Sequence, residues 1–266
     1  MNKYFFNHDL SPLLGLADSQ IITFIGGGGK TSLMNTLGKE FASHGYPTLL
    51  TTTTHIMKPD FLSDESYIEN EDLGQLANIF TNLKKPLAAL GIPEKVVNSN
   101  VKWRSPSSDF CEKIAEFSKK FSTKNPYKFL KILCEGDGSK RLPIKLPKDG
   151  EPVFFPKTDT VIGVIGLSCL GKPIKETLFR YELLPNLTSL DNYFIKSLQS
   201  TDIVTTDFLY RLCLSEKGLR KNITSQKFCI IFNQADILDE KALAEVITLR
   251  NQLQTKGICP HIISVK

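Results

Sequence analysis

A run of four glycines between a hydrophobic stretch and an amphipathic stretch constrains the fold of this chain most strongly. The stretch "IITFIGGGGKTSLM" (21–34) passes from β-branched and aromatic residues through the glycines into Lys30 and Thr31. Apolar residues then recur at helical spacing over 30–45, and a second β-branched stretch follows at 47–56. This order predicts a βαβ unit, in which the two strands are parallel and the crossover is right-handed.

Strand and helix patterns continue to alternate along the rest of the chain. We expect further strands at 127–138, 159–167, 227–236 and 260–266. Helices are expected at 10–17, 71–83, 109–122 and 239–255, with a further helical region near 187–220. Trp103 is placed in a loop, and the proline-rich stretch 142–156 is expected to be mostly irregular. The alternation predicts an α/β protein with a three-layer α/β/α, P-loop NTPase-like fold and a mainly parallel sheet.

The composition is that of an ordinary globular chain of 266 residues, 41% hydrophobic, with a net charge of +5. We expect one domain over 1–266, interrupted by an insertion around 84–126. The lysines are dispersed, so no nucleic-acid partner is expected. No run of about 18 apolar residues is present, and the first residues do not resemble a signal peptide, so no membrane span is expected. The six scattered cysteines indicate the reducing cytoplasm.

The glycine run is interpreted as a phosphate-binding loop. The usual pattern is G-x-x-x-x-G-K-S/T, and here a shorter G-x-x-G-K-T begins at Gly26, with Phe24 where the first glycine normally falls. Backbone N–H groups at the start of a helix bind phosphate, the lysine reaches the outer phosphates, and the threonine hydroxyl binds Mg²⁺. The predicted nucleotide-binding residues are Gly26, Gly27, Gly28, Gly29, Lys30, Thr31 and Ser32. The alternative is a flexible glycine turn that ends in an exposed lysine.

Two carboxylates follow the strand predicted at 127–138. Glu135 and Asp137 are expected to hold Mg²⁺ together with Thr31, or to orient an attacking water. The basic residues Lys140 and Arg141 come directly after them and bind either phosphate or an anionic substrate, or lie on the surface.

Thr54 and His55 close the stretch "TTTTHI", where ligands of open α/β sheets bind. A threonine hydroxyl there would reach Mg²⁺ or the γ-phosphate, and His55 would bind substrate or transfer a proton. The expected catalytic residues are therefore Lys30, Glu135, Asp137 and His55. The alternative is an ordinary strand with a structural histidine.

A second motif indicates which base is bound. "NQAD" (233–236) resembles the N-K-x-D motif of GTPases, with Gln234 in the position of the lysine. Asp236 would accept hydrogen bonds from guanine, while Asn233 would tie the loop. Ser264 lies where a short S-A-K loop backs the guanine in GTPases. GTP is therefore favoured, with ATP as the alternative.

Several stretches together resemble the YqeC family. They are "FIGGGGKTSLM", "LLTTTTHI", "CEGDGSKRLPIKLP", "EPVFFP", "VIGVIGLSCLGKP", "FRYELL" and "FNQAD". The resemblance covers roughly residues 10 to 240. It implies an accessory protein for selenium-dependent molybdenum hydroxylases, acting on such an enzyme or on its cofactor intermediate.

The resemblance also extends the set of expected site residues. It implies that Ser139 lines the site with Thr54 and His55, and that Lys172 and Arg180 bind substrate or a partner. This chain departs from the family pattern at three positions, which are Gly27, Phe179, where the family has histidine, and Gln234, where it commonly has lysine.

Three functions are compatible with these residues. The first is a Mg²⁺-dependent P-loop NTPase that uses GTP and assists maturation of a selenium-containing molybdenum hydroxylase. The second is an ATP-dependent ligase or kinase for a small anionic substrate, since G-x-x-G-K-T also resembles the phosphate loop of Mur ligases. The third is a non-catalytic interaction protein that is switched by nucleotide.

Overall fold

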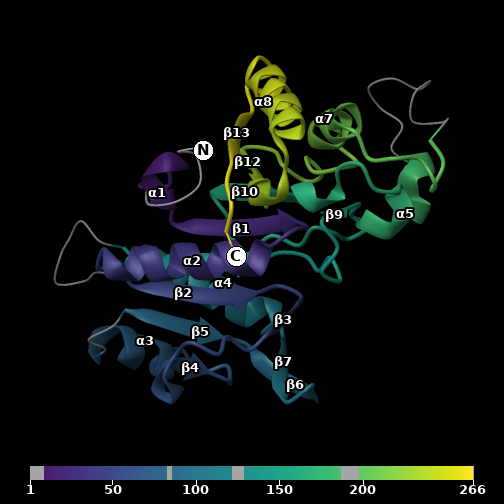
Figure 1. Ribbon diagram of the computed structural model, residues 1–266. Coiled ribbons are helices and arrows are strands. Elements are labelled where there is room, and N and C mark those ends of the chain that lie inside the picture. Colours follow the sequence, from purple (N-terminus) through teal and green to yellow (C-terminus); the bar gives the residue numbers. More distant parts are fainter. Residues whose placement is uncertain (1–8, 83–85, 122–128, 187–197, 266) are drawn as a thin grey trace.

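The computed structural model describes residues 9–82, 86–121, 129–186 and 198–265. Its centre is an eight-stranded sheet in which every neighbouring pair of strands is parallel (Figure 1). In sheet order the strands are β13 (Cys259–Ile262), β12 (Lys227–Asn233), β10 (Thr160–Gly166), β1 (Ile21–Gly26), β8 (Lys131–Glu135), β2 (Thr48–Thr52), β5 (Leu87–Leu90) and β4 (Tyr67–Ile68). β1, β8 and β10 are buried along their whole length, which explains their continuous apolar sequences.

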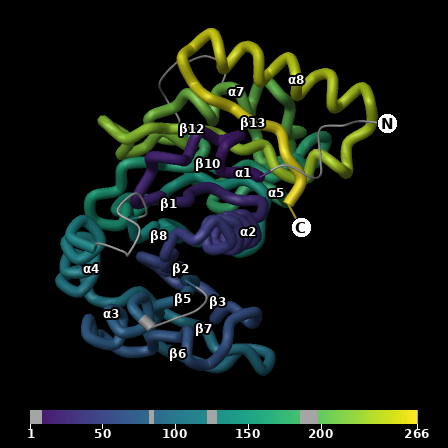
Figure 2. The backbone as a smooth tube through the Cα atoms, turned by 90° about the vertical axis from the view of Figure 1, so that its left-hand side faces the viewer, coloured from purple at the N-terminus to yellow at the C-terminus, as the bar shows by residue number. Residues whose placement is uncertain are grey.

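Helices cover both faces of the sheet. Successive residues of β1 point to opposite faces, so Phe24 packs with Leu33 and Met34 of α2 (Lys30–Ser43), while Ile21 and Ile25 belong to clusters on the other side. The short α1 (Leu10–Leu13) lies with α2. The opposite face is covered by α3 (Leu73–Asn82), α4 (Ser108–Lys120), α7 (Thr206–Leu214) and α8 (Glu240–Gln254). Figure 2 shows α2 and α4 on either side of the sheet, which confirms the predicted three-layer α/β/α fold.

The strand predicted at 47–56 is wrong in its extent. β2 ends at Thr52, whose hydroxyl accepts a hydrogen bond from the N–H of Thr54 (3.0 Å) and turns the chain. His55 then begins β3 (His55–Met57), which belongs to a separate antiparallel sheet in the order β3, β7 (Asn100–Arg104), β6 (Ile92–Val97).

Trp103 lies on β7 rather than in the predicted loop. Its indole is buried, and its Nε1 donates to Glu69 at 3.0 Å. Within the predicted insertion at 84–126, β5 is part of the main sheet and α4 packs on it, whereas β6 and β7 form the small sheet. The division of this chain into a domain with an insertion stays a prediction.

The stretch 142–156 contains one strand that the sequence did not predict. β9 (Ile144–Lys145) pairs with β11 (Leu178–Phe179), which follows α5 (Ile174–Thr177). In the part of the chain that the structure describes, four 3₁₀ turns lie at Asp64–Ser66, Leu167–Cys169, Tyr181–Asn186 and Ala235–Ile237. Of the helical region expected near 187–220, α7 is present and 187–197 lie outside the described residues. None of the helices in the described ranges is both long and apolar enough to cross a membrane.

Candidate functional site

The glycine run is packed closely against neighbouring segments of the chain. Gly28 has a φ of +77°, and a Cβ there would lie 2.1 Å from the backbone nitrogen of Gly166. A Cβ on Gly29, at a φ of +109°, would lie 2.5 Å from Nδ2 of Asn233. At Gly27 the nearest atom would be the carbonyl oxygen of Leu142, at 2.5 Å. The glycines are therefore required by the protein's own packing, in addition to any need for close approach of a ligand.

Some backbone N–H groups of the glycine run already donate to acceptors within the described part of the protein, and others do not. The N–H groups of Gly27 and Gly28 donate to the carbonyls of Val164 and Leu142, at 2.9 and 3.2 Å. The first turn of a helix leaves its N–H groups without partners inside the helix, so those at the amino end of α2, over 29–32, are the ones open to a ligand. The candidate anion site is thus narrower than the predicted cradle and is centred on the helix terminus.

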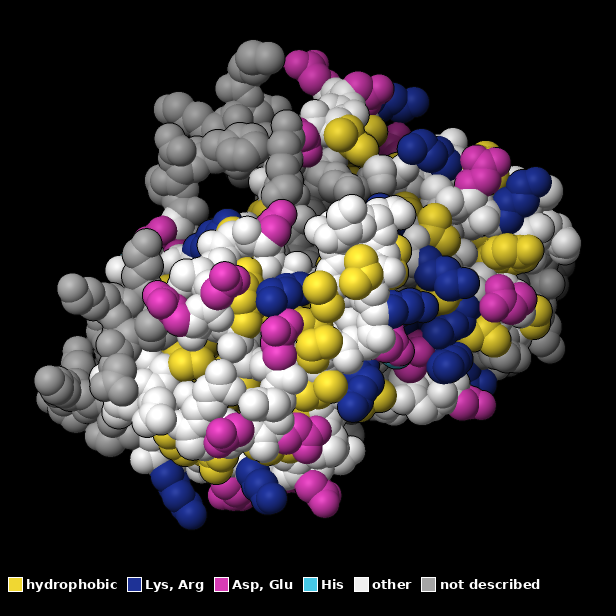
Figure 3. All heavy atoms as spheres, turned by 90° about the horizontal axis from the view of Figure 1, so that it is seen from below, with side chains coloured by type: hydrophobic (Ala, Val, Ile, Leu, Met, Phe, Trp, Pro, Cys, Tyr) yellow, Lys and Arg dark blue, Asp and Glu magenta, His cyan; other side chains and the backbone are white. Residues whose placement is uncertain are grey.

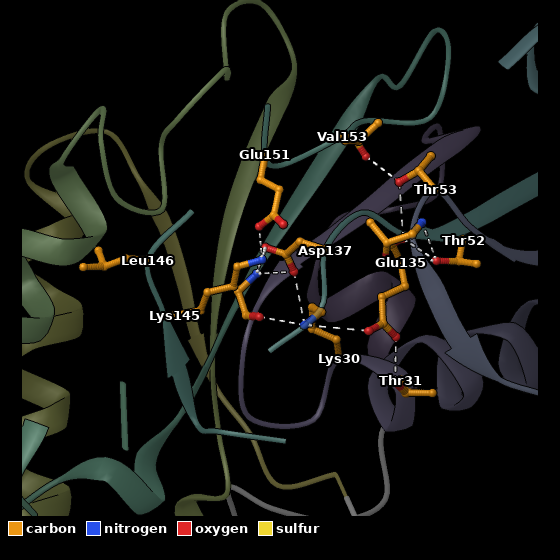
Figure 4. A network of polar contacts seen from close by, with 12 residues as sticks. Lys30, Thr31, Thr52, Thr53, Glu135, Asp137, Lys145, Leu146, Glu151 and Val153 are labelled. Atoms are coloured by element: carbon orange, nitrogen blue, oxygen red, sulfur yellow. Dashed lines mark hydrogen bonds and ion pairs between the residues drawn. The ribbon is translucent and has the colours of Figure 1, made fainter. Parts of the chain in front are cut away.

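Lys30 is buried at the floor of the site and surrounded by oxygen atoms. Only 3% of its surface is exposed, and its Nζ donates to the carbonyl of Gly26 at 2.6 Å. The same nitrogen lies 3.2 Å from Oδ1 of Asp137 and 3.8 Å from Oε1 of Glu135. Figure 4 shows Lys30 between the two carboxylates. The fold thus brings together three of the four expected catalytic residues.

The two carboxylates have different surroundings. Glu135 borders the cavity, and its Oε2 accepts a hydrogen bond from the hydroxyl of Thr31 at 2.6 Å. Burial raises the pKa of Glu135, against the opposing effects of Lys30 and Thr31. Asp137 lies behind the cavity wall, where both of its oxygens accept from the N–H of Gly26, at 3.1 and 3.2 Å. A hydroxyl and a carboxylate are ligands that suit Mg²⁺, so Thr31 and Glu135 could hold this ion better than Asp137 could.

A chain of alternating charges continues from Asp137. Its Oδ2 lies 3.2 Å from Nζ of Lys145, which in turn contacts Oε2 of Glu151 at 2.5 Å (Figure 4). Arg180 donates to both oxygens of Glu151, at 2.6 and 2.9 Å. Burial would raise the pKa of Glu151, but the hydrogen bonds from Arg180 and Lys145 outweigh it and lower the pKa to about 2. Lys145 and Glu151 were not predicted from the sequence, and the only signal is a lysine between apolar residues in "PIKLP".

A cavity of about 690 Å³ opens above these groups at the carboxyl ends of the central strands. Its lining residues are Gly28–Ser32, Thr54–Met57, Lys102, Glu135, Gly138–Arg141, Glu151, Phe179, Arg180 and Gln234. The volume falls within the range of small-molecule sites.

Most of the predicted substrate residues line this cavity. Thr54, Ser139 and Arg180 do so, and so does His55, whose Nε2 lies 3.2 Å from Oε1 of Glu94. Lys172 does not, because it lies in an exposed turn outside the lining residues.

Three of the predicted base-reading residues are held by hydrogen bonds at or after the ends of β12 and β13. Asn233 donates to the carbonyl of Gly28 at 3.0 Å and accepts from the N–H of Val265 at 2.8 Å, so it ties the glycine run to the C-terminal loop. The hydroxyl of Ser264 donates to Asp236 at 2.6 Å and accepts from its backbone N–H at 2.8 Å.

Fold and site together define a parallel α/β protein with a cavity at the carboxyl edge of its sheet. The cavity lies beside β1, the strand from which the chain adds strands first on one side and then on the other, and ligands of open α/β sheets bind at such a position. Residues 22–182 match the YqeC family, described as "YqeC protein". The chain belongs to the YqeC family, as the sequence motifs predicted.

A curated relative supports this assignment. The chain is 28% identical over 193 residues to "Uncharacterized protein YqeC" of Escherichia coli (strain K12). This match covers 69% of the chain and 66% of the relative, slightly less than two thirds of the relative's length. No solved structure matches the chain.

Proposed function

We propose that this protein binds a nucleoside triphosphate with Mg²⁺ and hydrolyses it. The observation that carries the proposal is the contact between Thr31 and Glu135 at 2.6 Å, beside the buried ammonium of Lys30 at the amino end of α2. One cation, one hydroxyl and one carboxylate thus converge where a helix terminus favours an anion. This combination supports nucleotide binding better than a plain glycine turn, in which the lysine would be exposed.

The roles of these residues follow from their surroundings. Lys30 would move from its carboxylate partners toward the outer phosphates and stabilise the charge that develops during transfer. Thr31 and Glu135 would hold Mg²⁺, which neutralises phosphate charge when bound. Asp137 would position the loop through Gly26 rather than bind the metal, since it is buried behind the cavity wall. His55 would reach substrate from β3.

GTP is the favoured nucleotide. Asn233 connects the glycine run to the C-terminal loop, and the carboxylate of Asp236 is held by Ser264 at an exposed position. This arrangement would present Asp236 to the N1–H and amino group of guanine. Gln234, which lines the cavity in a left-handed conformation, would cover part of the base.

The proposed cellular role is that of an accessory factor in selenium-cofactor and molybdenum hydroxylase maturation. Its support is the family resemblance of the sequence motifs. The nucleotide cycle would then act on a molybdenum hydroxylase or on its cofactor intermediate, and these are the partners to add to a turnover assay.

Calorimetric titration with GTP and with ATP, each with Mg²⁺, tests the nucleotide site. Lys30→Met keeps the apolar stem and removes the ammonium, so nucleotide affinity is expected to fall at least about tenfold. Thr31→Val keeps the shape and removes the hydroxyl, so the Mg²⁺ dependence of binding is expected to weaken. Lys39→Met, on the same helix and outside the cavity lining, is the matched control and is expected to bind as the wild type does.

The outcomes separate the proposed functions. GTP binding with turnover supports the NTPase. GTP binding without turnover, whether or not a molybdenum hydroxylase or its cofactor intermediate is added, supports a nucleotide-switched interaction protein. A preference for ATP contradicts the guanine assignment and favours a ligase or kinase. Binding of neither nucleotide by the folded wild-type protein overturns the proposal.

A further inference from the structure

The turn that follows Glu135 and Asp137 has an unfavourable sequence for its conformation. The N–H of Leu142 donates to the carbonyl of Ser139 at 2.9 Å, which closes a four-residue turn. Its two central residues, Lys140 and Arg141, have φ values of +49° and +65°. Turns with positive φ at both central positions favour pairs such as Asn-Gly, because long L side chains are strained there.

Strained backbone is concentrated around the cavity. Eight non-glycine residues of the described chain have positive φ, and half of them line this one cavity. These four are Lys140, Arg141, Arg180 and Gln234. Since strained conformations persist mainly where function retains them, this clustering points to a ligand.

The basic side chains that line this cavity differ in whether a carboxylate balances their charge. Arg180 stacks on the ring of Phe179, with its Cζ 4.6 Å from the ring centroid, and its charge is balanced by Glu151. The Nζ of Lys140 lies 5.3 Å from the same centroid. Within the described ranges, neither Lys140 nor Arg141 forms an ion pair with a carboxylate. Two positive charges therefore face the cavity without an anionic partner.

The turn and the proposed base site follow different strands of the main sheet, although the carbonyl of Leu142, at the end of the turn, accepts from the N–H of Gly28 at 3.2 Å. β8 leads into the turn on one side of β1, whereas Asn233 ends β12 on the other side of β1, beyond β10. The amino end of α2 follows β1 and lies between them. Seen from below in Figure 3, Lys and Arg side chains gather on the right-hand side of the molecule, where β3, β7 and α5 lie in Figure 1.

We propose that the turn of Lys140 and Arg141, with Phe179 and Arg180 beside it, is a subsite for a second ligand, a small molecule that carries a phosphate or carboxylate group. This proposal rests on the proposed function in one respect: the anionic group of the second ligand would bind next to the terminal phosphate of the nucleotide. Lys140 and Arg141, which have no carboxylate partner among the described residues, select a negatively charged ligand. The ion pair of Arg180 with Glu151 holds in place the cavity wall against which this ligand lies.

The double variant Lys140→Asn/Arg141→Gly tests the subsite, because Asn-Gly is the pair that the turn prefers. Its melting temperature is expected to rise by about 2 °C, since the strain is relieved. Its affinity for inorganic phosphate and for succinate is expected to fall at least tenfold. Binding of both probes is measured by calorimetry, with and without Mg²⁺ and a non-hydrolysable GTP analogue that fills the α2 site. Lys113→Gln/Lys256→Gln removes the same charge from exposed positions outside the cavity and controls for net charge.

The subsite is supported if the double variant is folded and stabilised but loses affinity for both probes. The affinity of the charge control must then remain within twofold of the wild type. Equal affinity in the wild type and the double variant, or no binding of either probe by the wild type, overturns it. The apo titration distinguishes this proposal from the nucleotide proposal. If the wild type binds phosphate but no nucleotide, and only the double variant loses phosphate binding, the subsite stands and the nucleotide proposal fails.

Discussion

Two segments at the carboxyl edge of the sheet adopt left-handed backbone conformations, and they do so with opposite residue types. The run 26–29 uses glycine, is packed mainly against backbone atoms, and leaves no room for a side chain. The turn of Lys140 and Arg141 uses two long cationic residues that are exposed. In the first segment packing dictates the residue type, whereas in the second the backbone conformation would favour other residues. The first segment therefore indicates how the site is built, and the second indicates what it binds.

The largest expected effect comes from adding a methyl group to the packed segment. In Gly28→Ala the new Cβ would meet the backbone nitrogen of Gly166 at 2.1 Å, at a φ of +77°. Backbone cannot move aside as a flexible side chain can, so strain and overpacking act together. The free energy of unfolding is expected to fall by about 4 kcal/mol. Urea unfolding followed by circular dichroism measures the change.

Gly138→Ala is the matched control, since it makes the same substitution directly before the exposed turn of 139–142. A Cβ on Gly138 meets nothing within 4 Å, and its φ is not positive. The expected change is within about 0.5 kcal/mol, or a slight stabilisation from the stiffer unfolded chain. Equal losses in Gly28→Ala and Gly138→Ala would show that the comparison between the two segments is wrong.

The sequence predicted the parts of the molecule that depend on local patterns. The βαβ unit, the three layers and the parallel sheet follow from hydrophobic periodicity, which reports which faces are buried. The family assignment followed from motif order. The pairing of Thr31 with Glu135 was also foreseeable, because a strand end and a helix start meet at one edge of a parallel sheet.

The remaining features depend on contacts between distant segments. Lys145 meets Asp137 and Glu151 because a short strand at 144–145 crosses the sheet edge, and no local pattern encodes that crossing. The carbonyls that occupy N–H groups of the glycine run likewise come from distant segments, so the sequence did not show them. The break after Thr52 is the exception, because it arises from a local side-chain hydrogen bond inside a β-branched stretch, where propensity alone favours a continuous strand.

The chain of charges between the glycine run and the cavity wall is expected to be the next most sensitive feature. Lys145 is 2% exposed and bridges Asp137, which holds the glycine run, to Glu151, which holds the cavity wall. Lys145→Met fills a similar volume and leaves the two carboxylates without the shared cation. The free energy of unfolding is expected to fall by about 3 kcal/mol, the low end for a broken buried pair, because each carboxylate keeps one other partner.

Lys148→Met, three residues further along, is the control for this substitution. Lys148 is exposed, so its loss is expected to change stability by less than about 0.5 kcal/mol. A Lys145→Met protein as stable as the control would mean that apolar packing fully offsets the ion pairs. The glycine run and the wall of Glu151 and Arg180 would then not be coupled through this chain of charges.

The smallest expected effect concerns the cavity wall and depends on pH. Glu151→Gln at pH 7 weakens the hydrogen bonds from Arg180 and Lys145, and is expected to cost about 1.5 kcal/mol. The folded-state pKa of Glu151, about 2, lies below its ordinary value of 4.5, so the unfolded state binds the proton first as the pH falls. The stability contributed by Glu151 is therefore complete above pH 4.5 and is lost between pH 4.5 and about 2.

Urea unfolding at pH 7, 4.5 and 3 should show that the difference in free energy of unfolding between wild type and Glu151→Gln narrows across this window. Other carboxylates titrate equally in both proteins, so a difference that stays constant down to pH 3 would mean that Glu151 is not held as a carboxylate by Lys145 and Arg180.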